Sequence, residues 1–136
     1  MYRSATSAVM VLMMVGVGAA SEVSPSKKVV FNRDVRPIFS DKCFACHGPD
    51  KVNRKTTLRL DRRESVFAQL SGGGRAIVPG DVKSSVLVER ISSRSPVRRM
   101  PPSHQGHAPL SEGEIDLISE WVSQGAEWQE HWSFIA

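Results

Sequence analysis

The sequence predicts an all-α domain of about four short helices joined by long loops. Apolar residues recur three or four positions apart within residues 32–46, 85–91 and 111–124, which is the spacing of one helix face. Hardly any segment alternates apolar and polar residues, as a half-buried strand would. The chain has 136 residues, of which 40% are hydrophobic and 24% charged, so it has room for one small globular domain.

The first expected helix spans residues 32–46, where Val35, Ile38 and Phe39 recur at helical intervals. Asn32 or Asp34 is expected to cap its start. Pro37 is best tolerated in the first turn, because that turn requires no backbone donor.

The second expected helix follows a polar, basic loop over residues 48–59. Asp61 and Glu64 resemble a capping box, which predicts a short helix through Leu70. The glycines of residues 71–74 end this helix. No Gly-Lys-Ser/Thr sequence follows them, so we interpret the segment as a turn and not as a phosphate-binding loop.

Two further helices are expected before the C-terminus. Ser84 or Ser85 is expected to cap the third, whose apolar face contains Leu87, Val88 and Ile91. Residues 95–109 contain four prolines and a glycine, which predicts an extended loop. The fourth helix begins with the cleanest capping box of the chain, formed by Ser111 and Glu114, and ends at Gly125. Its apolar stripe consists of Ile115, Ile118, Trp121 and Val122.

The first twenty residues have the layout of a secretory signal peptide. One cation, Arg3, precedes an apolar run over residues 8–17, and small residues follow at 18–20. The run is well short of the roughly 20 residues that span a bilayer. We therefore expect cleavage after Ala20 and an exported protein in the periplasm or cell envelope, with membrane contact only if the signal is retained.

The net charge of the chain excludes little by itself. The formal value is +4 at pH 7, and the expected cleavage removes one of the basic residues, Arg3. Such mild basicity in an exported protein argues against nucleic acid as a partner. It fits equally a solvated surface and weak steering towards an acidic partner.

The two cysteines of the chain carry its strongest chemical signal. They stand in Cys43-Phe44-Ala45-Cys46-His47, a C-x-x-C-H sequence, which is the attachment signature of a c-type haem. On one helical turn both thiols reach the two haem vinyl groups and the histidine comes beneath the iron. Export supports this interpretation, because c-type haem is attached outside the cytoplasm.

Three rival interpretations of the cysteines are weaker. A disulfide over this spacing would close a very small loop and stabilise little. A thioredoxin-like redox pair requires a sheet that the sequence does not predict. A zinc site formed by Cys43, Cys46, His104 and His107 has suitable ligand types, but the gap between its two halves far exceeds common zinc-finger spacing.

The second axial ligand of such a haem is predicted to be Met100. It is the sole methionine after the expected signal peptide, and the prolines that follow it, Pro101 and Pro102, are suited to holding its sulfur rigidly. His104 and His107 are the alternative ligands and would give a lower reduction potential. Histidine and methionine together leave no open coordination position, which suits reversible electron transfer.

At this point the sequence resembles the planctomycete-type cytochrome c domain over about residues 29–132. The similarity rests on the stretches FNRDVRPI at 31–38, CFACHGPD at 43–50, LRLD at 58–61, GGRAIVPG at 73–80, SVL at 85–87, RI at 90–91, MPP at 100–102, LS at 110–111 and WVSQGA at 121–126.

The resemblance implies a class I cytochrome c fold around one covalent haem c. Cys43 and Cys46 would bind the haem, with His47 as proximal and Met100 as distal ligand of the iron. We further expect Arg75, or backbone amides near it, to lie near a haem propionate. The expected organisation is a signal peptide at 1–20, a flexible arm at 21–28, the cytochrome domain at 29–126 and an aromatic tail at 127–136.

The expected function is that of a monohaem electron carrier, because His47 and Met100 together would leave no open coordination position. The sequence suggests no nucleophile with its base and no catalytic carboxylate pair. Its partners would be a redox protein donor and acceptor, both unidentified. The alternative is a haem-based sensor in which Met100 dissociates and a small molecule binds in its place.

Replacing both cysteines tests the attachment directly. The double variant Cys43→Ala, Cys46→Ala lacks both sulfurs, so we expect it to bear no covalent haem. Haem staining of denaturing gels, after expression in a host with c-type haem maturation, would measure this. A double variant that still stains for haem would refute the assignment of these cysteines as the attachment site.

Overall fold

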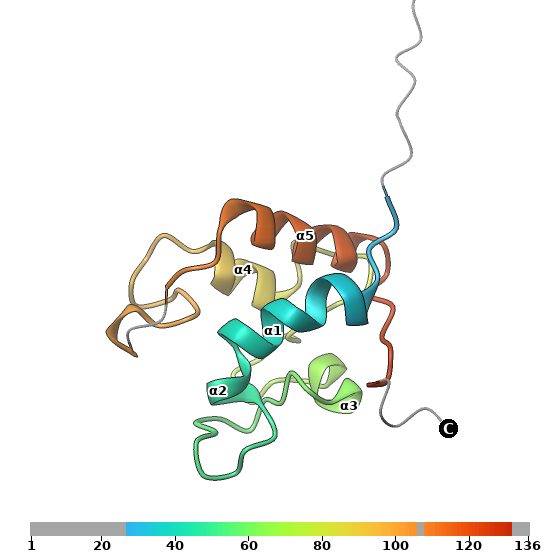
Figure 1. Ribbon diagram of the computed structural model, residues 1–136. Helices are drawn as coiled ribbons and strands as arrows, with labels where there is room; N and C mark the ends of the chain where they lie inside the picture. The colour runs from blue at the N-terminus through green and yellow to red at the C-terminus, as the bar shows by residue number, and fades with distance from the viewer. Residues whose placement is uncertain (1–26, 106–107, 132–136) are drawn as a thin grey trace, which may run out of the picture.

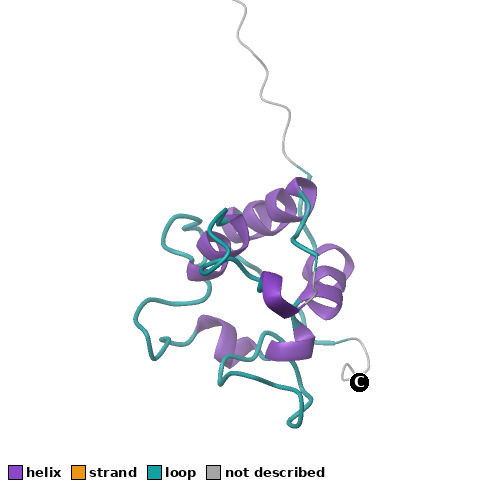
Figure 2. Ribbon diagram, turned by 90° about the vertical axis from the view of Figure 1, so that its left-hand side faces the viewer, coloured by secondary structure: helices purple, strands orange, loops and turns teal. Residues whose placement is uncertain are grey.

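The computed structural model describes residues 27–105 and 108–131, so the expected signal peptide lies outside the described residues. Within this part the chain is helical and contains no strand (Figure 1, Figure 2). The all-α prediction is therefore confirmed. The elements in order are a π-helical turn η1 (Phe31–Val35), α1 (Arg36–Lys42), α2 (Phe44–His47), α3 (Arg63–Phe67), α4 (Val86–Ser92), a 3₁₀ turn η2 (Ser103–Gln105) and α5 (Glu112–Ser123).

The first expected helix is present but divided, since η1, α1 and α2 follow one another with an interruption at Cys43. Pro37 lies in the first turn of α1, as expected. The expected cap by Asn32 or Asp34 is wrong, because Val30 occupies the cap position. Asp34 instead accepts the backbone N–H of Val30 at 2.7 Å. Hydrogen bonds from Arg33 and from this amide lower the pKa of Asp34 to about 2.

The helices α3 and α4 lie in the segments that the sequence predicts, although α3 ends at Phe67 and does not reach the expected Leu70. The side-chain capping bonds differ from those expected. The expected capping box of Asp61 and Glu64 is wrong, since Arg62 is the cap residue of α3 and makes no side-chain cap bond. Asp61 pairs with Arg59 instead. Ser85 does precede α4, yet its buried hydroxyl accepts the N–H of Val78 and donates to the carbonyl of Asp81.

The helix α5 begins with the predicted capping box. The amide of Glu114 donates to the Ser111 hydroxyl at 3.3 Å, and the Ser111 amide donates to the Glu114 carboxylate at 2.7 Å. Two N–H groups that have no partner within the helix are thereby used. At the other end the chain leaves the helix through Gly125, whose φ of +100° suits glycine.

An aromatic cluster joins the two ends of the domain. Trp121 of α5 is 1% exposed, and its ring centroid lies 5.1 Å from that of Phe31 and 6.2 Å from that of Phe39. Trp128 of the tail lies 4.1 Å from Phe31 on the same measure, and the guanidinium of Arg36 lies over both rings. The expected tail residues Trp132 and Phe134 lie outside the described residues.

The remaining helices complete the core around this cluster. Helix α5 packs against both η1 and α4, and α1 leads directly into α2 (Figure 1). The buried side chains come from every α-helix except α2. In the described part of the chain, none of the helices is both long and apolar enough to cross a membrane.

Removing one ring from the cluster should destabilise the whole domain. Phe39 is fully buried, so Phe39→Ala is expected to lower the free energy of unfolding by about 3–5 kcal/mol. Val97 is 88% exposed, so Val97→Ala should change it by less than about 0.5 kcal/mol. Urea unfolding followed by circular dichroism would compare the two variants, and equal effects would contradict the described core.

Candidate functional site

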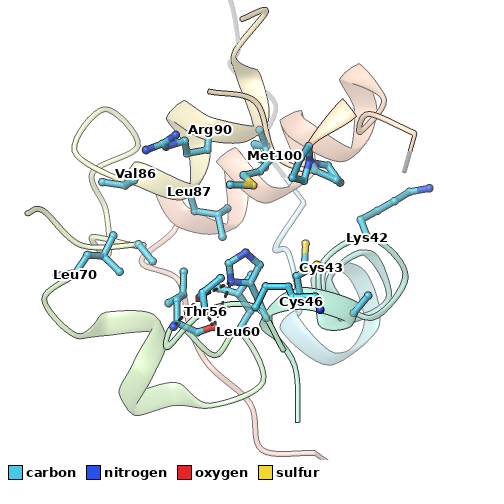
Figure 3. Close-up of a pocket in the computed structure, with 18 residues that line it drawn as sticks. Lys42, Cys43, Cys46, Thr56, Leu60, Leu70, Val86, Leu87, Arg90 and Met100 are labelled. Carbon is cyan, nitrogen blue, oxygen red and sulfur yellow. Dashed lines mark hydrogen bonds between the residues drawn. The ribbon is translucent and has the colours of Figure 1, made fainter. Parts of the chain in front are cut away.

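A cavity of about 340 Å³ lies between α2, α4 and the loop that follows α4 (Figure 3). Its walls are mostly apolar and include Leu58, Leu60, Leu70, Val86, Leu87 and Ile91. The volume falls within the usual range for small-molecule and cofactor sites. The polar and sulfur-bearing side chains that reach it are few, which makes each of them a candidate ligand.

The C-x-x-C-H segment forms one wall of this cavity. Cys43, Cys46 and His47 all line it, with Cys46 and His47 on the single turn of α2. The two cysteines are not joined in a disulfide. Burial raises the pKa of the Cys43 thiol to about 12, so this thiol is neutral at physiological pH. A redox-active dithiol depends on a thiolate, so this environment does not favour one.

The orientation of His47 is set by the loop that follows it. Its Nδ1 lies 3.2 Å from the carbonyl oxygen of Leu58, to which it donates, and 3.3 Å from the Thr56 hydroxyl. The tautomer with the proton on Nδ1 leaves Nε2 as the basic nitrogen. Burial lowers the pKa of His47, while the bond to Leu58 partly offsets this effect. A neutral imidazole with one fixed N–H is the usual form of a metal-binding histidine.

The same loop is tied to α2 through its backbone. The amide of Lys55 donates to the Cys46 carbonyl at 3.1 Å, and the amide of Leu60 donates to the His47 carbonyl at 2.8 Å. These bonds use the carbonyl groups that a short helix leaves unsatisfied at its end. The loop over residues 48–60 therefore stabilises α2 and also orients its histidine.

Gly48 allows this chain reversal. A Cβ atom at this position would lie 2.7 Å from the Cβ of Phe44 and closer still to the Phe44 carbonyl oxygen. No larger residue fits without moving α2. The position is distinctive in the sequence, because the glycine directly follows the C-x-x-C-H segment.

Met100 lines the cavity from its other side. The loop after α4 carries it, and Figure 3 shows Met100 and Leu87 above the cavity with Cys43 and Cys46 on the opposite wall. Its backbone amide donates to the Arg90 carbonyl at 3.1 Å, which fixes the loop against α4. Pro101 and Pro102 line the cavity beside it.

The other expected ligands are placed differently. His104 is exposed and is not among the cavity-lining residues, and His107 lies outside the described residues. No group of three or more His, Cys, Asp or Glu residues in the described part of the chain is arranged to hold a metal ion. Arg75 is also exposed and lines no part of the cavity, so its place near a propionate stays a prediction.

Thr56, Leu58 and Arg90 belong to the site, although no motif in the sequence marks them as functional. Thr56 and Leu58 lie nine and eleven residues beyond His47 in a loop, where no periodic spacing links them to it. Arg90 stands four residues after Val86 in α4, and both residues line the cavity. The sequence alone did not mark Val86 as a wall residue, so this spacing gave no signal for Arg90.

Comparison with known proteins supports the resemblance seen in the sequence. The family model of planctomycete cytochrome C matches residues 43–104, a segment that runs from the first cysteine through Met100 and His104. The helices α1 and α5 lie outside this match. No curated protein and no solved structure matches the chain.

Two glycine substitutions should have opposite effects on stability. Gly48→Ala introduces the overlap with Phe44 and should cost about 1–3 kcal/mol of unfolding free energy. Gly113→Ala places a Cβ in open space within α5 and should stabilise by about 0.5–1 kcal/mol. Thermal unfolding would measure both, and a Gly48→Ala protein as stable as the parent would contradict the described packing of α2.

Proposed function

We propose that this chain, which carries a planctomycete cytochrome C domain at residues 43–104, binds one haem c covalently and carries single electrons. The observation that carries the proposal is the meeting of four side chains in one apolar cavity. Cys43, Cys46, His47 and the thioether of Met100 all line it, although 52 positions separate the last two in the sequence. A class I cytochrome c fold around the haem is part of the same proposal.

The residues present fit a haem. Apolar walls suit the faces of the porphyrin, and two thiols on one wall suit covalent attachment. Each thiol would add across one vinyl group, its sulfur bonding to one carbon and its hydrogen passing to the other. His47, with its Nδ1 proton held by Leu58, presents Nε2 as a ligand of the iron.

Met100 supplies the second ligand in this proposal. A thioether favours ferrous iron and raises the reduction potential relative to two histidines. The hydrogen bond from its amide to Arg90 and the prolines that follow it restrict the loop that carries the sulfur beside the cavity. The haem supplies the reversible one-electron chemistry, and the protein supplies ligation, burial and orientation.

The proposal extends to location and partners. The layout of residues 1–20 supports export to the periplasm or cell envelope, followed by an arm at 21–28, the cytochrome domain at 29–126 and a tail at 127–136. Electrons would come from one redox protein and pass to another. Lys42 and Lys55 line the cavity, and cations there favour partners with acidic surfaces.

A reduced-minus-oxidised visible spectrum tests the function. Protein made in a host with c-type haem maturation should be red, keep its haem after denaturation and show sharp reduced bands. A colourless product, with maturation working on a control cytochrome, would refute haem binding. A haem protein whose reduced spectrum changes readily under carbon monoxide would indicate the sensor with a displaceable Met100 instead.

Replacing Met100 tests the ligand assignment. Met100→Ala should retain covalent haem, lose the red charge-transfer band of a ferric iron–thioether bond and have a lower reduction potential, because the thioether no longer favours ferrous iron. His104→Ala is the matched control, since His104 is exposed and should change none of these properties. Redox titration with visible spectroscopy measures all three, and loss of the band in His104→Ala alone would overturn the assignment.

A further inference from the structure

A second cavity, of about 420 Å³, adjoins the apolar one and differs from it in chemistry. The two share His47, Leu58, Leu70, Val86 and Arg90, among others, so they lie side by side. The adjoining cavity is lined by polar groups that the apolar cavity lacks, namely Thr57, Ser65, Gln69 and Ser71, together with Gly72 and Gly73. The combined site thus has an apolar part and a polar end.

The polar end lies away from the cysteines. Leu70, Val86 and Arg90, which both cavities share, lie across the apolar cavity from Cys43 and Cys46 (Figure 3). The vinyl and propionate groups of haem stand on opposite edges of the porphyrin. A haem attached at Cys43 and Cys46 would therefore direct its two propionates towards the adjoining cavity.

We propose that the adjoining cavity receives the haem propionates and that Arg90 is their cationic partner. This inference rests on the proposed function, since it concerns the same haem. Among the described residues, Arg90 is the one arginine or lysine that lines both cavities. A guanidinium is suited to this role because its parallel N–H groups match a carboxylate.

The guanidinium of Arg90 is available for such a pair. Its Nη1 donates to the Arg98 carbonyl at 3.3 Å, and no carboxylate in the described part of the chain forms an ion pair with it. Lys42 and Lys55 line the apolar cavity alone, and Arg75 lines neither. Arg90 is therefore favoured over Arg75 as the arginine partner of the propionates. Gly72 and Gly73 line the adjoining cavity, so their backbone lies near the proposed propionate site.

Further donors at this end are not engaged elsewhere. The side chains of Thr57, Gln69 and Ser71 make no hydrogen bond within the described residues. The Thr56 hydroxyl, in contrast, already accepts the Leu58 amide at 2.9 Å. The adjoining cavity therefore offers one cation and several uncommitted polar groups to two carboxylates.

The experiment compares Arg90→Gln, Arg90→Lys and Arg75→Gln in the haem-loaded full chain. Redox titration at pH 8 measures the potential, and redox-induced infrared difference spectra report the propionate carboxylates. Removing a cation beside the haem disfavours the added electron, so Arg90→Gln should lower the potential and shift the carboxylate bands. Arg90→Lys should largely restore the potential, and Arg75→Gln should match the parent.

Two controls separate this inference from the proposed function and from structural damage. Absence of haem in the parent would refute the proposed function itself. Retention of the iron–thioether band in Arg90→Gln shows that Met100, whose amide bonds to the Arg90 backbone, is undisturbed. With haem and band present, unchanged potential and carboxylate bands in Arg90→Gln, or the shift in Arg75→Gln instead, would overturn the role of Arg90.

Discussion

The packing of Trp121 against Phe31 and Phe39 is the contact on which the domain depends. It joins α5 to the first helical segment, although these residues lie at opposite ends of the chain. The indole N–H donates to the Glu127 carbonyl at 3.0 Å, so the polar edge of the buried ring is satisfied as well. Short helices have little stability by themselves, so the stability of these helices depends on buried tertiary contacts such as this one.

The position of the cavity follows from that contact. The segment held by Phe31 and Phe39 continues directly into Cys43 and α2, so one wall of the cavity is set by the aromatic cluster. The opposite wall belongs to α4, which packs on the same α5. Helix α5 itself contributes no lining residue to either cavity. It acts as the support against which both walls are positioned.

The loop over residues 48–60 gives the candidate ligand its direction. A four-residue helix leaves its carbonyl groups largely unsatisfied, and the loop supplies amides to those of Cys46 and His47. The carbonyl of Leu58, in the same loop, accepts a hydrogen bond from Nδ1 of His47. Stability of the helix end and orientation of the imidazole are therefore coupled, and Gly48 is the residue that lets the chain turn so closely.

The sequence was sufficient to predict an interaction where the interacting residues lie within one helical turn of each other. The C-x-x-C-H spacing places its side chains together through a single helical turn, and the Ser111–Glu114 capping box forms within one turn of α5. The expected caps at Asp34 and Asp61 were wrong because each side chain has another partner. Ser85 is the cap residue of α4 as expected, but it makes no side-chain cap bond, because its buried hydroxyl bonds to Val78 and Asp81.

By itself the sequence determined the helical class, the order of the helices and the chemical identity of the candidate ligands, because helix periodicity and motif spacing are short-range properties. Only the tertiary structure decided which distant residues share the cavity. Met100 faces Cys43 and Cys46 from a loop without regular spacing, Leu58 reaches His47 by chain reversal, and Arg90 lies where two cavities meet. These relations depend on how α4 and the loops pack on α5, and such long-range contacts leave no periodic trace in the chain.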